Sequence, residues 1–478
     1  MKIFLTPLKS QGGNTLILTI VVTGLVGFLL ASYMGLVKSQ NIATMRSQAW
    51  NAAIPVIEAG LEEALTHINT QVTNELATNG WTRHGTLWAT KRWVGSNYYS
   101  VTISNWVAGS WTNHPVVEAR GYVIAPVTMA SINGPVFATV SANPAARGHV
   151  ARGIRCVART DALFSKGLVA KGQIDLNGKN ILSDSYDSRY TNFSSNGRYD
   201  VTKRKAGGSV ATNSGLTNSV NIGNATIYGK ISTGPGGSIK IGPQGSVGDA
   251  AFVEAPGGAN NGRIQTDYFS DDMNVDFPDV KTPTLIPFWT FMSPGSYGGE
   301  NFDYAPQPGN YRLVELRMSG AADMVVTGHT VIHVTGLIDI SGTARIKIAL
   351  GGRLTLYVGT ATGPPVSANI GGLGIVNENA SALSFVYYGL PSNTTLNITG
   401  NGTYVGCVYA PNAALTLFGG GAAAEDFSGA IIARTVTMGG NFNFHYDEAL
   451  MYVGPPKGYI VTRWDEMTPQ EVASGPSL

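Results

Sequence analysis

The chain has 478 residues, and its length excludes a single small fold. Charged residues make up 13% of the chain, against about 25% in an average soluble protein, whereas glycine alone accounts for 60 residues. Lys plus Arg number 32 and Asp plus Glu 30, so the net charge of +2 gives no general attraction to polyanions. This composition is typical of a turn-rich β protein, and we expect no nucleic-acid partner.

The N-terminal segment is long and apolar enough to cross a membrane. Residues 14–37 contain no charged side chain and are bounded by Lys9 and Lys38. About 20 apolar residues in a helix span the roughly 30 Å of bilayer hydrocarbon. A cleaved secretory signal is the alternative, but its apolar region is normally only about 7 to 15 residues long. The pattern therefore favours a transmembrane helix from Thr15 to Val37.

The helix is predicted to continue beyond the membrane as an amphipathic segment within a region of residues 14–80. Apolar side chains recur at steps of three and four along residues 40–78, which is typical of a helix that packs along one face. These apolar positions are Trp50, Ile54, Ile57, Leu61, Leu65, Ile68, Val72 and Leu76.

The first 70 residues or so resemble the N-terminal region of PilX-type minor pilins. The resemblance rests on the leader ending Gln11-Gly12-Gly13, on the apolar span, and on residues 49–53 (AWNAA) and 58–62 (EAGLE). It implies that residues 1–13 form a leader, which a prepilin peptidase removes after Gly12 or Gly13, so that the mature chain begins at Gly13 or Asn14.

The resemblance also carries expectations about partners and location. It implies packing against other pilin-like subunits in a pilus or pseudopilus. It implies that the anchor lies in a bacterial inner membrane and that the C-terminal part is exported, on a pilus or at the cell surface. The fifth mature residue would be Ile17 or Leu18 where major pilins carry glutamate, which suits a minor, tip-located or initiating subunit better than a repeating one.

Residues 81–160 are predicted to form a β-rich head that follows the helix. Alternating segments such as Tyr98–Ile103 and Val116–Val123 indicate strands. Five tryptophans lie between Trp81 and Trp111, and we expect them to pack the head onto the helix, with a carbohydrate-stacking platform as the alternative. A helix followed by an antiparallel sheet is also what the pilin resemblance implies.

Residues 161–453 form a long glycine-rich region of short apolar strands. The clearest strands lie in Val220–Ile231 and Val325–Val358, and Gly or Asn interrupts them at intervals of roughly eight to twelve residues. Glycine or asparagine at tight corners suits a right-handed β-helix, which we favour, with a β-sandwich as the alternative. The fold class is thus mainly β with a long N-terminal α-helix and a small pilin-like α+β region.

The end of this region resembles the C-terminal domain of an uncharacterised family of bacterial exported proteins. The resemblance rests on Gly406–Ala413, Phe427–Ala433, Phe444–Leu450 and Asp184–Ser188, and it extends over roughly residues 162–450. It implies a β-helical architecture without an established activity. Residues 454–478, rich in Pro, Ser and Gly, are predicted to be a flexible tail.

The chain carries no nucleophile elbow, Walker loop, HExxH, EF-hand or paired CxxC motif. We therefore expect no enzyme activity and no cofactor. The alternative is a glycan-active enzyme that uses a carboxylate cluster, and its candidate residues are Asp184, Asp187, His445 and Asp447.

Three further groups of residues are weaker candidates for metal or redox chemistry. An acidic stretch offers oxygen ligands for calcium, although a solvated loop explains it as well; its members are Asp271, Asp272, Asp276 and Asp279. His329 and His333 would lie some 13 Å apart along a strand, at about 3.3 Å per residue, so we expect surface histidines rather than a metal site. Cys156 and Cys407 are expected to be buried and unpaired.

The sequence as a whole predicts a membrane-anchored, pilin-like surface protein with a structural or adhesive β-helical head. The expected partners are the membrane, other pilin-like subunits, a prepilin peptidase and a glycan or other surface ligand. A static envelope stalk that assembles with no other subunit is the first alternative, and the glycan-active enzyme is the second.

Overall fold

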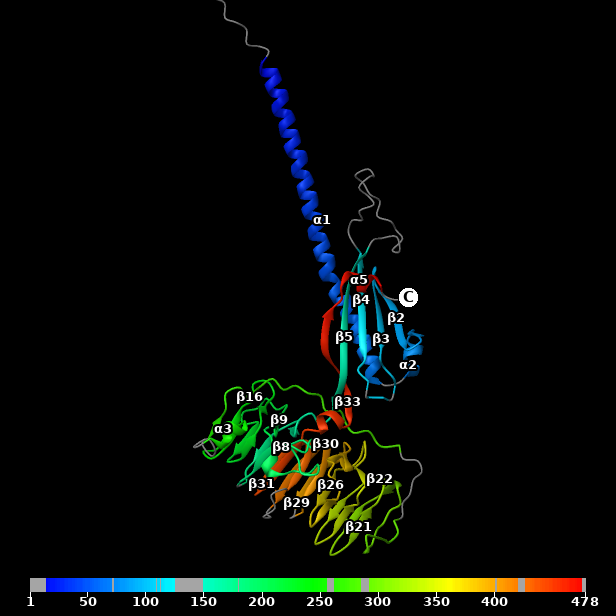
Figure 1. The fold of residues 1–478 in the computed structure, drawn as a ribbon, viewed down its shortest axis with the longest axis vertical. Coiled ribbons are helices and arrows are strands. Elements are labelled where there is room, and N and C mark those ends of the chain that lie inside the picture. The colour runs from blue at the N-terminus through cyan, green and yellow to red at the C-terminus, as the bar shows by residue number, and fades with distance from the viewer. Residues whose placement is uncertain are drawn as a thin grey trace, which may run out of the picture. The chain divides into compact units, whose positions relative to one another are not determined.

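A computed structural model describes residues 14–70, 73–108, 110–111, 113–124, 149–178, 180–255, 262–284, 292–399, 402–419 and 426–474. The chain divides into two compact units, and Figure 1 shows their elements. The helical unit comprises residues 1–161 and 457–478, and the glycine-rich unit comprises residues 162–456. The chain is mainly β with one long N-terminal helix, as the sequence predicted.

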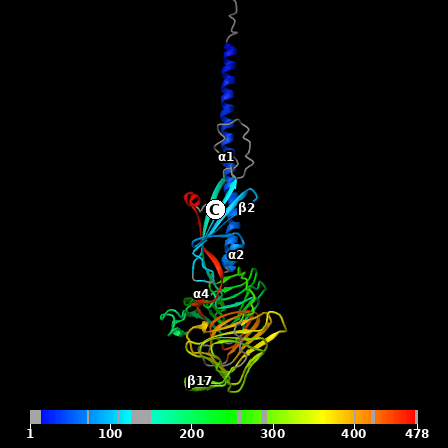
Figure 2. The same cartoon turned by 90° about the vertical axis from the view of Figure 1, so that its right-hand side faces the viewer.

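The helical unit combines that helix with an antiparallel sheet. Helix α1 runs from Asn14 to Thr70 and α2 from Thr73 to Thr78, and α1 is one uninterrupted helix in both views (Figures 1 and 2). The sheet has the strand order β1-β2-β3-β4-β5-β33. Its strands are β1 (Thr82–His84), β2 (Leu87–Val94), β3 (Asn97–Ser104), β4 (Val116–Ile124), β5 (His149–Ala162) and β33 (Pro456–Glu466).

One face of the sheet packs closely on the C-terminal half of α1. Ala53, Ile57 and Ile68 are each fully buried in a shared core with apolar residues of β3 and β4. Gly121 on β4 permits the close approach, because a Cβ atom there would stand only 2.8 Å from the Ala53 carbonyl oxygen. The predicted continuation of the apolar helix into an amphipathic one is confirmed.

The C-terminal segment belongs to this sheet, which corrects the predicted flexible tail. Strand β33 lies beside β5, with Tyr459 buried in the core of the unit. Helix α5 (Pro469–Ala473) follows and begins with a capping box, in which Thr468 and Glu471 bond each other's backbone N–H groups. The residues around Tyr459 pair with β5, a strand far away in the sequence, so the local abundance of Pro, Ser and Gly does not determine their structure. Residues 475–478 lie outside the described part of the chain.

The glycine-rich unit consists mostly of short strands joined by tight turns. Its helical elements are η3 (Val201–Lys203), α3 (Ala250–Glu254), η4 (Ala382–Ser384) and α4 (Leu450–Val453). Its strands in the first part are β6 (Leu168–Ala170), β7 (Ile174–Leu176), β8 (Leu182–Tyr186), β9 (Val210–Thr212), β10 (Val220–Gly223), β11 (Thr226–Tyr228), β12 (Ile231–Ser232), β13 (Ile239–Ile241), β14 (Ser246–Gly248), β15 (Arg263–Ile264) and β16 (Phe269–Ser270).

The second part of the unit contains longer strands. They are β17 (Gly295–Tyr297), β18 (Glu300–Phe302), β19 (Gly309–Leu313), β20 (Leu316–Met318), β21 (Asp323–Val326), β22 (His329–Val334), β23 (Ile338–Ile340), β24 (Arg345–Ile348), β25 (Arg353–Val358), β26 (Val366–Ile370), β27 (Gly374–Asn377), β28 (Phe385–Gly389), β29 (Asn393–Thr399), β30 (Tyr404–Gly419), β31 (Phe427–Gly440) and β32 (Asn443–Asp447).

These strands pair in long parallel ladders. One ladder runs β19-β22-β25-β28-β30-β31-β6-β9-β12-β16. A second runs β20-β23-β26-β29-β30-β31-β7-β10-β13. Alternate side chains point inward along each strand and form one continuous aliphatic and aromatic core. Only β17 and β18 form an antiparallel hairpin of named strands among the described residues of this unit.

Within the ladders, the strands are not stacked in the order in which they occur in the sequence. The first strand of the unit, β6, lies in the middle, between β31 near the C-terminal end and β9. The two ends of the unit therefore meet, and the Leu163 N–H donates to the Pro455 carbonyl at 2.8 Å. Since β5 leads into the unit and β33 leaves it, the whole glycine-rich unit is an insertion between two neighbouring strands of the helical unit's sheet.

Close stacking between the strands depends on glycine at particular positions. Gly429 on β31 has a φ of +141°, and a Cβ atom there would lie 1.9 Å from the carbonyl oxygen of Gly406 on β30. No side chain fits at that separation, so any other residue would push the two strands apart.

Candidate functional site

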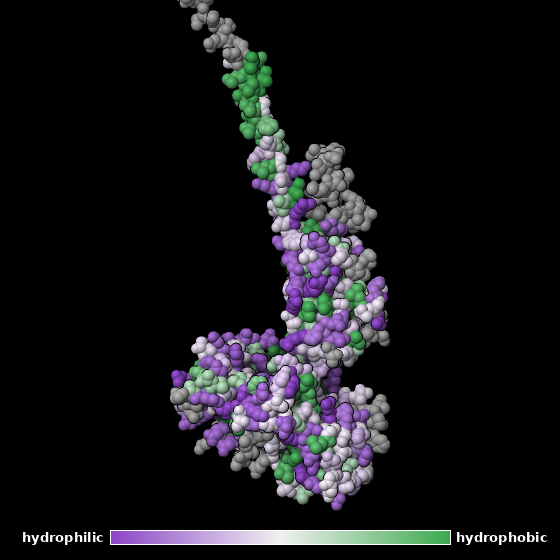
Figure 3. All heavy atoms as spheres, in the orientation of Figure 1, coloured by the Kyte–Doolittle hydropathy of each residue, from purple (hydrophilic) through white to green (hydrophobic). Residues whose placement is uncertain are grey.

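The N-terminal half of α1 is apolar and exposed along its length. Leu16, Phe28 and Met34 are 68%, 71% and 70% exposed. Figure 3 shows this segment as a continuous hydrophobic stretch. The helix is the one in the described chain that is long and apolar enough to span a membrane, by length and composition. Burying such side chains in lipid instead of water is favourable by about 25 cal/mol per Å² of apolar surface.

The predicted leader, residues 1–13, lies outside the described residues. Gly12 and Gly13 are among the residues that the structure does not describe, and Asn14 is the first residue of α1. The predicted span from Thr15 to Val37 falls entirely within α1.

A partly buried carboxylate, Glu63, fixes the C-terminal half of α1 to the sheet. Glu63 accepts hydrogen bonds from Arg92 at 2.6 Å, from the Tyr99 hydroxyl at 2.5 Å and from the Trp81 indole at 3.1 Å. Burial opposes ionisation of Glu63, but the hydrogen bonds from Arg92 and Tyr99 outweigh it and lower the pKa of the carboxyl below its usual value. Burial and the bond to Glu63 raise the pKa of Tyr99 to about 12.

The predicted packing role of the tryptophans is confirmed for most of them. Trp81 and Trp106 are buried in the core that α1 shares with the sheet, and Trp88 and Trp111 pack against that core. Trp93 differs, because it is 52% exposed and stacks near Tyr98. A platform made of all five residues is therefore not present.

The glycine-rich unit brings together two of the predicted polar residues in its interior. The Nδ1 atom of His445 on β32 lies 2.5 Å from Oδ1 of Asp184 on β8, and both side chains are fully buried. The Tyr199 hydroxyl donates to Oδ2 of Asp184 at 2.7 Å, and its ring stacks on His445 with centroids 3.5 Å apart. The parallel register that aligns His445 with Asp184 produces this contact.

The other two predicted carboxylates lie nearby but have partners of their own. Asp187 forms a two-pronged ion pair with Arg189, with distances of 2.9 and 2.7 Å, and this pair lowers the pKa of Asp187. Asp447 accepts the backbone N–H groups of Ser188 and Ala449, while burial raises its pKa. The bond from the Ser188 N–H to Asp447 joins the segment after β8 to the end of β32.

The buried Asp184–His445 cluster is therefore suited to holding strands together. Hydrolytic chemistry needs carboxyl groups that a substrate can reach, and Asp184 and His445 have no exposed surface. The cluster lies where β32, near the end of the unit, pairs with β8, near its beginning. The hydrogen bond between His445 and Asp184 crosses this junction and satisfies two buried polar groups.

The acidic stretch after β16 runs along the outside of the ladders. Its apolar residues Met273, Phe277 and Val280 are buried, whereas its four predicted calcium ligands are exposed; these are Asp271, Asp272, Asp276 and Asp279. Asp279 accepts from Asn412 at 2.6 Å. In the part of the chain that the structure describes, no three His, Cys, Asp or Glu side chains come together to hold a metal ion.

The remaining candidates are separate from one another. His329 is exposed, whereas His333 is buried and its Nε2 atom lies 2.8 Å from the Gly359 carbonyl oxygen; burial lowers the pKa of His333. Cys156 lies in the helical unit and Cys407 in the glycine-rich unit, and both thiols are buried and free.

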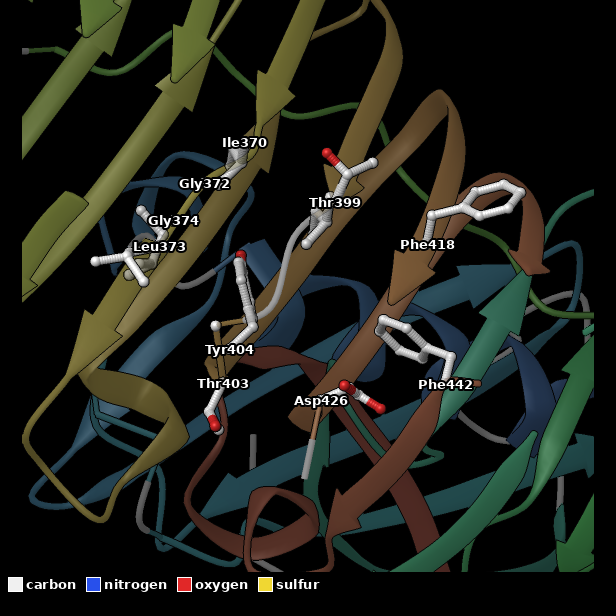
Figure 4. Close-up of a pocket in the computed structure, with 13 residues that line it drawn as sticks. Ile370, Gly372, Leu373, Gly374, Thr399, Thr403, Tyr404, Phe418, Asp426 and Phe442 are labelled. Atoms are coloured by element: carbon white, nitrogen blue, oxygen red, sulfur yellow. The ribbon is translucent and has the colours of Figure 1, made fainter. Parts of the chain in front are cut away.

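A cleft in the glycine-rich unit was not anticipated from the sequence. Figure 4 shows Tyr404 between Thr399 and the segment Gly372–Gly374, with Phe418 and Phe442 on the far side. The space inside the cleft is about 20 Å³. No local sequence pattern predicts the cleft, because the lining residues come from several strands that only the parallel stacking brings together.

Part of the glycine-rich unit matches a known family. A family described as "Domain of unknown function (DUF7305)" matches residues 300–453, about a third of the chain. No curated protein matches the sequence. Among solved structures, the competence-associated pilin ComZ from Thermus thermophilus aligns over 87% of this chain and 97% of its own, at 12% identity and a TM-score of 0.26.

Proposed function

We propose that this chain is a membrane-anchored, pilin-like surface subunit, in the manner of a minor pilin or pseudopilin. The observation that carries the proposal is the division of α1 into two halves. Its N-terminal half exposes apolar side chains throughout, and its C-terminal half buries Ala53, Ile57 and Ile68 against an antiparallel sheet. Such a helix holds a head outside a membrane while its free half packs in lipid or against the helices of like subunits.

The glycine-rich unit is proposed to be a β-helical head with a structural or adhesive role. Its long parallel ladders support a β-helix over a β-sandwich, because sandwiches are built from antiparallel sheets. The proposal includes no catalysis. Its support is that the one buried Asp–His pair among the predicted residues has no surface that a substrate could touch.

Leader processing tests the pilin part of the proposal. Co-expression of the full-length chain with a prepilin peptidase should shorten it by the 12 or 13 leader residues that end at Gly12 or Gly13. Intact-mass measurement distinguishes the two cut sites. A matched variant with bulky residues at both positions, Gly12→Leu with Gly13→Leu, should keep its full mass. An unchanged mass for the wild-type chain beside a processed control pilin would refute pilin-type assembly.

A static envelope stalk remains the second candidate, supported by the same exposed apolar half of α1. The two functions differ in what happens to the anchor. A pilin-like subunit leaves the membrane with sheared surface fibres after processing, whereas a static stalk stays in the membrane fraction at full length.

A further inference from the structure

We propose that the cleft of Figure 4 is a binding subsite for a neutral saccharide, which gives the proposed adhesive head its ligand class and so rests on that proposed function. The cleft contains a buried hydroxyl without a partner. Tyr404 is 3% exposed, and its hydroxyl makes no hydrogen bond. A buried polar group left unpaired is unfavourable by about 1 to 3 kcal/mol, so an incoming hydroxyl that bonds it gains affinity.

The Tyr404 ring is held rigidly, so the hydroxyl keeps one position. It stacks on Phe427 with centroids 4.6 Å apart and meets Phe385 edge-on at 5.2 Å. The space inside the cleft, about 20 Å³, admits a group the size of one water molecule. A single hydroxyl group fits inside, and the ring that carries it must stay at the mouth.

The mouth of the cleft offers an apolar platform for such a ring. Phe418 is 49% exposed and Leu373 is 42% exposed, although both are large apolar residues. The Phe418 ring lies close to Gly439 on the next strand, where a Cβ atom would stand only 2.4 Å from it, and about half of the side chain remains exposed. Aromatic faces of this kind bind the C–H faces of sugar rings, while polar groups beside them bind the hydroxyls.

The charge of the cleft favours an uncharged ligand that donates hydrogen bonds. Among the described lining residues Asp426 is the only one that can carry a charge. Its Oδ2 atom accepts the Asn443 N–H at 2.8 Å, and burial raises its pKa. A carboxylate acceptor without a cationic neighbour in the lining disfavours acidic sugars and suits hydroxyl donors.

The neighbouring sheet surface extends the site along the ladder. Thr399 and Phe418 follow Asn397 and Thr416 by two residues, so each pair shares one face of its strand. Asn397 and Thr416 are themselves aligned in register, and Asn397 donates to Asn369 on the next strand at 2.7 Å. Hydrogen-bonding side chains thus repeat at the ladder spacing of about 4.8 Å beside the cleft, which suits a polymer over a single sugar.

The test uses full-length protein in detergent micelles and immobilised glycans. The neutral probes are β-1,4-glucan, chitin and α-mannan, with alginate as the acidic comparison. Binding to at least one neutral probe and weaker binding to alginate are expected. Tyr404→Phe should weaken binding by about three- to tenfold, the loss of one hydrogen bond, while its thermal midpoint stays the same or rises. Phe418→Ala should weaken binding by at least as much.

A matched variant separates binding from stability. Tyr387→Phe removes a buried hydroxyl that does have a partner, Asn393 at 3.0 Å, outside the cleft. It should lower the thermal midpoint and leave glycan binding unchanged. Equal glycan binding by wild type and Tyr404→Phe overturns the proposal, because it is the result expected of a cleft that holds only an ordered water. A wild-type protein that binds no neutral probe also overturns it.

The same preparations, with and without prepilin peptidase, keep the two proposals apart. A chain that is processed but binds no neutral glycan refutes the saccharide subsite alone. A chain that binds a neutral glycan through Tyr404 but is never processed supports the subsite and refutes pilin-type assembly.

Discussion

Removing the Asp184 carboxylate should destabilise the glycine-rich unit more than almost any other polar substitution in it. Asp184 accepts from His445 at 2.5 Å and from Tyr199 at 2.7 Å, with no exposure of its own side chain. Asp184→Ala leaves both donors buried without an acceptor. Breaking such a buried pair costs about 3 to 5 kcal/mol. Asp184→Asn keeps the shape and one acceptor oxygen, so its expected cost is about 1 to 3 kcal/mol.

Thermal unfolding of the full-length chain, followed by circular dichroism at the β-sheet minimum, measures this effect. At about 2 °C per kcal/mol for a unit of this size, Asp184→Ala lowers the midpoint by roughly 6 to 10 °C and Asp184→Asn by roughly 2 to 6 °C. Asp271→Ala, which removes an exposed carboxylate of the same unit, is the control and should stay within about 1 °C. Equal midpoints for Asp184→Ala and Asp271→Ala would refute a role of this cluster in holding β8 and β32 together.

Three further predictions concern the packing of α1, the pH response and the thiols. Gly121→Val should destabilise the helical unit by about 1 to 3 kcal/mol, because the new Cβ atom would lie 2.8 Å from atoms of Ala53 and Ile57. Unfolding followed by tryptophan fluorescence measures this effect, and an unchanged unfolding midpoint would contradict the close approach of α1 to β4. The pKa of Glu63 is lowered in the folded state, so its ionised carboxylate stabilises the fold above the unfolded pKa of about 4.5, and this stabilisation is lost as the pH falls through the folded pKa. Glu63→Gln should therefore reduce the loss of thermal midpoint between about pH 5 and 3. An equal loss in wild type and variant would contradict this role of Glu63. Burial raises the pKa of Cys407, so iodoacetamide should alkylate it only after unfolding, as mass spectrometry would show; rapid labelling of the native chain would be inconsistent with its burial.

The parts of the fold that depend on local pattern could be predicted from the sequence. The uncharged run of residues 14–37 requires a long apolar helix, and the three- and four-residue spacing of Ile57, Leu61 and Ile68 requires a buried face. The glycine-separated alternation after residue 162 likewise requires short strands with tight turns.

The parts that depend on distant pairing could not be predicted. Strand β33 lies beside β5 although the whole glycine-rich unit separates them in sequence, and local pattern alone therefore predicts a flexible tail over residues 454–478. Asp184 and His445 were both identified as candidates, but their contact follows from the register of β8 with β32. The cleft around Tyr404 was missed because its residues are ordinary apolar and polar positions of strands until the ladders stack.

Membrane extraction of the full-length chain tests the central claim most directly, namely that the exposed apolar half of α1 anchors the protein in a bilayer. Membranes from expressing cells are washed with high salt and with alkaline carbonate, then treated with detergent. The chain should stay in the pellet through both washes and dissolve only with detergent, whereas a deletion of residues 14–37 should appear in the soluble fraction. Full-length protein that dissolves without detergent would contradict the account.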